Sequence, residues 1–175
     1  MTTEVLIFTL IAVIAGIALS VLLSAFFSGS EMALSSCNRV RLENEADEGK
    51  KASKRALSLA EHFDETLSTI LIGNNLVNVL ASTLTTVLVM LLSEYVFKTT
   101  MDLNFLGTLV VTVLVIIFGE TIPKIVCKKR STEMSAKLSG GLLFSRILFF
   151  PITFIVTGLV KLITMGIKER KTDLE

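Results

Sequence analysis

Three long stretches of the chain are apolar and carry no charged residue, at 5–27, 66–93 and 103–119. A helix needs about 20 predominantly apolar residues to cross a bilayer, and each stretch meets or approaches that length. Residues rich in polar and charged side chains separate the first stretch from the second. The pattern predicts an all-α membrane protein with three transmembrane helices, at about 4–35, 66–93 and 103–127.

Composition and charge agree with this class and predict an orientation. Hydrophobic residues make up 51% of the chain, and the mean hydropathy is +0.71. No basic residue precedes the first stretch and no small-residue cleavage site follows it, which favours a retained helix over a signal peptide. Lys and Arg gather between the first and second stretches and again after the third. The positive-inside rule therefore predicts a multi-pass protein of the cell membrane, with its N-terminus outside and its C-terminus cytoplasmic.

The connection between the first two stretches has a pattern of its own. Residues 37–64 are rich in charged residues that favour helices, and Gly49 near the middle is typical of a turn. This pattern predicts a helical hairpin on the cytoplasmic face.

A fourth apolar stretch, at 138–167, allows two readings. Arg146, Pro151 and Lys161 interrupt it, and a fourth crossing would carry the basic residues that follow it to the outside. We expect a bent juxtamembrane belt at about 132–167, lying in the inner interface of the membrane. A fourth transmembrane helix is the alternative. With the belt ending at 167, residues 1–167 form the transmembrane domain and residues 168–175 begin a linker.

Each predicted transmembrane helix also carries polar groups at membrane depth. They lie on one face of a helix or at a break in it: Ser24 and Ser28, Asn74 and Asn78, and Gly119 with Glu120. Pro123 cannot donate a hydrogen bond to the carbonyl four residues before it, so it frees the carbonyl of Gly119. An acid inside a membrane is costly and usually faces a cavity.

These groups offer only oxygen atoms, which suit a hard cation such as Mg²⁺, and Na⁺ could use the same donors. Each group could also have a purely structural role. Serine and asparagine can simply join helices, and Glu120 could serve only as an ion-pair partner of Lys124.

Three motifs in the sequence resemble those of a known protein family. "SAFFSGSEMALSS", "LIGNNLVN" and "FGETIPK" follow one another in the chain and resemble the transmembrane domain of the CorC/cyclin M family of Mg²⁺ transporters. The resemblance covers about residues 20–167. It implies a homodimer with an inward-open polar cavity and Mg²⁺ export, with Na⁺ coupling as one form of it. Carried over by position, the implied metal ligands are Ser24, Ser28, Asn74, Asn78, Gly119 and Glu120. Full-length members continue into a cytoplasmic CBS-pair module that binds ATP, and nothing in this chain resembles that module.

Two functions with the same ion site follow from these observations. One is a magnesium transporter, and the other is a membrane-embedded Mg²⁺ sensor that binds the ion without moving it. An enzyme is not expected, because no His or Lys lies at membrane depth to activate a nucleophile such as Ser28. A nucleic-acid partner is not expected either, since the chain has no basic groove with interleaved aromatic residues.

Overall fold

A computed structural model describes residues 2–97 and 103–164, and all elements in this part of the chain are helices. The two longest are α1 (Thr3–Ser35) and α7 (Ser131–Thr164), and α4 spans Phe63–Leu91. The remaining elements are α2 (Arg39–Asp47), α3 (Lys51–Glu61), η1 (Leu92–Phe97), α5 (Leu103–Ile116), η2 (Ile117–Thr121) and α6 (Ile122–Lys129). The expected fold class, an all-α membrane protein, is confirmed.

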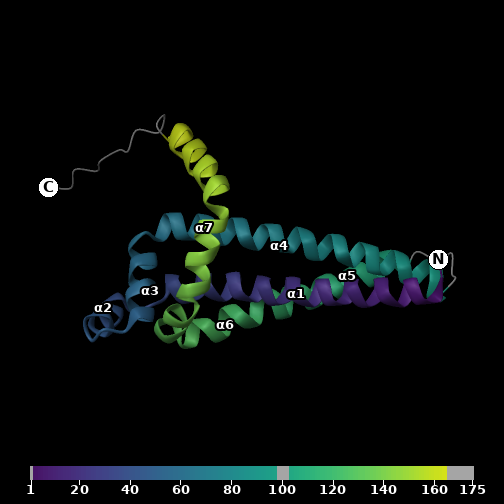
Figure 1. Cartoon of the computed structure of the whole chain (residues 1–175), viewed down its shortest axis with the longest axis horizontal. Coiled ribbons are helices and arrows are strands. Elements are labelled where there is room, and N and C mark those ends of the chain that lie inside the picture. Colours follow the sequence, from purple (N-terminus) through teal and green to yellow (C-terminus); the bar gives the residue numbers. More distant parts are fainter. Residues whose placement is uncertain (1, 98–102, 165–175) are drawn as a thin grey trace.

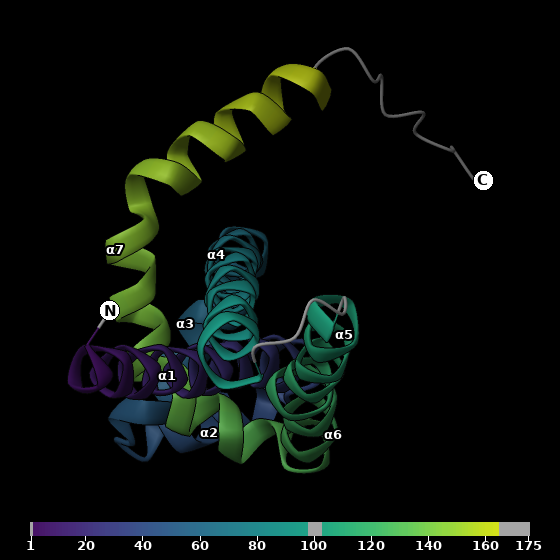
Figure 2. The same cartoon turned by 90° about the vertical axis from the view of Figure 1, so that its right-hand side faces the viewer.

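Helices α1 and α4 lie side by side along the long axis of the molecule, and α5, η2 and α6 follow one another beside them (Figures 1 and 2). Most apolar side chains of these helices face outward. Phe8, Leu22, Val79 and Val110, for example, are exposed. Helices that are apolar on their outer faces are typical of a lipid environment.

The number of membrane-spanning helices expected from the sequence is not confirmed. By length and composition, four helices in the described part of the chain could cross a membrane: Thr3–Ser35, Phe63–Tyr95, Thr108–Lys129 and Ser131–Val156. The fourth qualifies because Arg146 is the only charged residue between Lys137 and Lys161, which leaves a sufficiently apolar window.

Helix α7 takes a different course from the other long helices. It runs across α1 and α4 near the end of the bundle where α2 and α3 lie, and it is bent (Figures 1 and 2). Pro151 lies inside α7 and removes one backbone hydrogen bond there, which is the common cause of a kink. The expected belt end at 165–167 and the expected linker at 168–175 lie outside the described residues.

Helices α2 and α3 form a short pair joined at Gly49, whose φ of 89° is readily adopted only by glycine. The Asn38 side chain caps α2 by accepting a hydrogen bond from the Arg41 backbone N–H, at 3.0 Å. Ser53 Oγ donates to Glu45 Oε2 at 2.8 Å and so ties α3 to α2. This hydrogen bond has the largest part in lowering the pKa of the Glu45 carboxyl, and the bond that Arg41 Nε donates to Glu45 Oε1 has the next largest.

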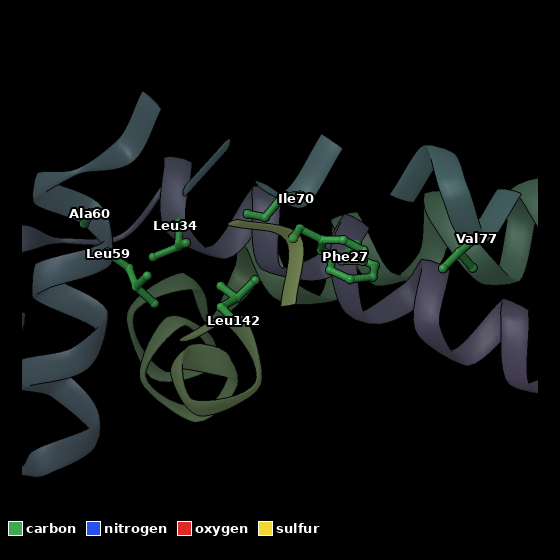
Figure 3. Close-up of a cluster of buried hydrophobic side chains, with 8 residues drawn as sticks. Phe27, Leu34, Leu59, Ala60, Ile70, Val77 and Leu142 are labelled. Atoms are coloured by element: carbon green, nitrogen blue, oxygen red, sulfur yellow. The ribbon is translucent and has the colours of Figure 1, made fainter. Parts of the chain in front are cut away.

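A hydrophobic core fixes the crossing of α7 over the bundle. Its labelled members come from α1, α3, α4 and α7: Phe27, Leu34, Leu59, Ala60, Ile70, Val77 and Leu142 (Figure 3). Gly73 of α4 makes room for the Phe27 ring, because a Cβ atom there would lie 2.5 Å from Phe27 Cζ. Gly141 of α7 similarly faces the Phe26 ring, where a Cβ atom would lie 2.8 Å from Cζ. The aromatic pair of α1 thus holds α4 on one side and α7 on the other.

Candidate metal centre

Four polar side chains meet where α1 packs against α4. Ser24 Oγ lies 3.1 Å from Asn74 Oδ1 and 3.0 Å from Asn78 Oδ1, and Ser28 Oγ lies 3.5 Å from Asn74 Oδ1. Ser24, Ser28 and Asn74 are buried, and Asn78 is half-buried. The two hydroxyl protons are shared among three oxygen–oxygen contacts, so lone pairs remain available in this cluster. The i, i+4 spacing on both helices therefore brings the four predicted ligands together.

Gly119 and Glu120 lie in η2, between α5 and α6, where the helix type changes. The backbone N–H of Ile122 donates to the carbonyl of Ile117, five residues back, so η2 forms a π-helical turn. Single π-helical turns are rare and often occur at functional sites. Gly119 is buried against α1, and a Cβ atom there would lie only 3.2 Å from Ser24 Oγ. A glycine at this position lets the backbone of η2 come close to the serine.

A cavity of about 150 Å³ adjoins this cluster. Its polar lining comes from four elements: Ser24, Asn78, Ser82, Thr85, Thr112 and Glu120. Along α4 and α5 these residues continue from the level of Glu120 away from α2 and α3. The resemblance implies a cavity open to the cytoplasmic side, and that opening stays a prediction.

Glu120 also belongs to a second cluster, which consists of three charged side chains. Lys124 Nζ is 3.4 Å from Glu120 Oε1 and 3.2 Å from Glu31 Oε2. Glu31 follows Ser28 on α1, and Lys124 follows Glu120 by one helical turn, so the cluster lies between the serine–asparagine group and the end with α2 and α3. The side chains of Glu31 and Lys124 are each 29% exposed, and that of Glu120 is 37% exposed. Glu120 thus lines the cavity and also pairs with Lys124.

Part of this neighbourhood was not predicted from the sequence. Ser82 and Thr85 continue the face of α4 that carries Asn78, at four and seven residues further on. This spacing is a signal that the sequence offers. The approach of Glu31 to Lys124 has no such signal, since it depends on how α1 packs against α6. Within residues 2–97 and 103–164, no three His, Cys, Asp or Glu side chains gather into a metal cluster.

Comparison with known proteins identifies the family. The model of the cyclin M transmembrane N-terminal domain (CNNM) matches residues 14–174. The chain is 34% identical over 149 residues to the UPF0053 inner membrane protein YfjD of Escherichia coli, covering 83% of this chain and 33% of that protein. It is 35% identical over 154 residues to a UPF0053 protein of Haemophilus influenzae, covering 87% of this chain and 35% of the relative. The chain thus spans about a third of the length of these curated relatives. It belongs to the cyclin M transmembrane-domain family.

Proposed function

We propose that this chain is the ion-conducting part of a magnesium transporter. The observation that carries the proposal is the meeting of Ser24 with Asn74, Asn78 and Gly119 beside a polar cavity that Glu120 also lines. Membership of the cyclin M family suggests a role linked to divalent-cation transport, and the chemistry of the site favours the same class of ion.

The donor set fits Mg²⁺ as the transported ion. Mg²⁺ prefers about six oxygen ligands and commonly takes one or two carboxylates. The proposed ligands are two hydroxyls, two amide carbonyls, one carboxylate and one backbone carbonyl: Ser24, Ser28, Asn74, Asn78, Glu120 and Gly119. Na⁺ can use the same donors and is the proposed coupling ion. Export from the cytoplasm is the proposed direction.

Lys124 has a part in this proposal as a tethered cation. Its ammonium group holds Glu120 while no metal ion does, and Glu31 offers a second carboxylate to which the ammonium group can turn. Mg²⁺ arriving from the end with α2 and α3 meets Glu31 and Lys124 before it reaches the serine–asparagine cluster. Exchange of one cation for another keeps Glu120 from facing the membrane interior without a counter-charge.

The proposed topology places α7 in the inner interface, with the N-terminus outside and the C-terminus in the cytoplasm. Its crosswise course over α1 and α4 supports this, as does the ion pair between Arg146 and Glu65 near the start of α4. In a chain with its own cysteines replaced, Glu43→Cys on α2 and Thr172→Cys are expected to react with an impermeant maleimide from the same side. Reaction from opposite sides would show that α7 crosses the membrane.

We also propose a homodimer, because three helices do not easily enclose a polar cavity and two-fold dimers are the commonest closed assembly. The exposed apolar faces of α4 and α5 offer surface for it. Light scattering in mild detergent should give twice the mass of the chain. A monomer that binds Mg²⁺ normally would argue against the dimer. A cytoplasmic CBS-pair module is the expected partner domain in the full-length protein.

Flux separates this function from that of a Mg²⁺ sensor, which needs the same ion site. Liposomes that contain the purified protein and an enclosed Mg²⁺-sensitive dye should show Mg²⁺ movement down an imposed gradient. Vesicles with Glu120→Gln protein are the control for leakage. Tight Mg²⁺ binding together with no flux above that control would favour the sensor.

A further inference from the structure

Three basic side chains without ionic partners among the described residues lie together on one face of α3. Several basic residues near this end of the molecule pair with a carboxylate, as Arg41 does with Glu45 and Lys50 does with Glu48. Lys51, Lys54 and Arg55 form no ion pair with any residue that the structure describes. All three are exposed, and their spacing places them on one face of α3. Three positive charges close together with no counter-charge favour an anionic ligand.

These residues line a groove between α3 and α7. The groove has a volume of about 370 Å³, and Ser58 and Leu143 complete its lining. Arg55 Nε donates to Ser139 Oγ of α7 at 3.4 Å, which keeps its guanidinium beside α7. The opposite face of α3 is packed into the core through Ala56 and Leu59. The groove is therefore held open by two packed helices and combines a basic wall with an apolar side chain.

The apolar side continues along α7 beyond the groove. Ile147 and Phe150 follow Leu143 at four and seven residues, so they extend the same face of the helix. Phe154 lies beyond Pro151, and its ring centroid is 6.3 Å from that of Phe150. Ile147 is 76% exposed, and Phe150 and Phe154 are also exposed. We call Leu143, Ile147, Phe150 and Phe154 the apolar stripe of α7. A free phosphate has no apolar group that could pack on this stripe, whereas the acyl chain of a lipid would cover it.

We propose that the groove between α3 and α7 binds the headgroup of an anionic phospholipid. Lys51, Lys54 and Arg55 hold the phosphate, and an acyl chain lies along the stripe from Leu143 to Phe154. Basic pockets beside apolar helices on the cytoplasmic side of membranes favour such lipids. The proposal does not depend on ion transport, because neither the groove nor the stripe shares a residue with the candidate metal centre.

Native mass spectrometry of the full chain in mild detergent tests the proposal. Phosphatidylglycerol should bind at least fivefold more tightly than phosphatidylcholine with the same acyl chains. Lys51→Gln/Lys54→Gln/Arg55→Gln should lower phosphatidylglycerol binding at least tenfold. The matched control is Arg39→Gln/Lys128→Gln/Lys129→Gln, which removes three other exposed, unpaired charges of the described residues outside the groove. This control should change binding less than twofold.

Three outcomes would overturn the proposal. Equal binding of the two lipids would show that the charges do not select a headgroup. An equal loss in both triple variants would reduce the effect to general surface charge. Displacement of the lipid by an equal concentration of glycerol phosphate would show a site for free phosphate, without a part for the stripe on α7.

Discussion

Glu120→Gln is expected to weaken Mg²⁺ binding at least tenfold, which corresponds to about 1.4 kcal/mol. Glutamine keeps the size of the side chain and one carbonyl oxygen but removes the negative charge. Glu120 lines the cavity together with Ser24 and Asn78, which supply only neutral oxygens. Neutral donors alone compensate poorly for the dehydration of a divalent cation, since attraction between charges dominates at the low dielectric of a membrane protein. Isothermal calorimetry on the folded protein measures the change.

Three further binding measurements test whether this loss of affinity comes from the charge of Glu120. Glu43→Gln removes the same charge from an exposed position on α2 and should leave Mg²⁺ affinity unchanged. Asn78→Ala should cost less than Glu120→Gln, because water can replace one neutral ligand. Binding should also weaken in acid, since protons and the metal compete for the carboxylate oxygens. Wild-type affinity in folded Glu120→Gln protein would mean that Glu120 serves only as the partner of Lys124 and that the ion binds elsewhere.

Spacing along single helices predicted much of the candidate site. Ser24 with Ser28, and Asn74 with Asn78, are four residues apart, and a helix necessarily places such pairs on one face. The sequence could not show that these two faces point toward each other. The structure supplies this in the contacts of Ser24 with both asparagines, and in the close approach of Gly119 to Ser24.

Features that depend on packing between distant segments escaped the sequence analysis. Glu31 and Lys124 are far apart in the chain, and only the packing of α1 against α6 brings their side chains within 3.2 Å. The same limit applies to α7. Its hydropathy resembles that of a transmembrane helix, while its course across the bundle is determined by Phe26, Phe27 and the core that they share with it. Hydropathy reports the composition of a helix and carries no information about its direction.

Lys124→Gln is expected to tighten Mg²⁺ binding about tenfold, and Glu31→Gln is expected to weaken it. The ammonium group of Lys124 lies 3.4 Å from the carboxylate that we assign to the metal. Two like unit charges about 5 Å apart repel by roughly 3 kcal/mol at an effective dielectric of about 20, and the double charge of Mg²⁺ raises this repulsion. Removing Lys124 abolishes the competition for Glu120. Removing the charge of Glu31 takes away the other partner of Lys124, so the ammonium group remains on Glu120 and competes more strongly.

Opposite signs in these two variants distinguish a competing cation from a structural ion pair. If the three side chains only hold α1 against α6, both substitutions would break the same contact and both would weaken Mg²⁺ binding. Lys128→Gln is the matched control, because it removes a basic charge one turn further along α6, at an exposed position. Calorimetry of the three variants, with thermal unfolding to verify that each is folded, gives the signs directly. A loss of affinity in Lys124→Gln would remove the tethered-cation role, because a competitor cannot improve binding of the ion with which it competes.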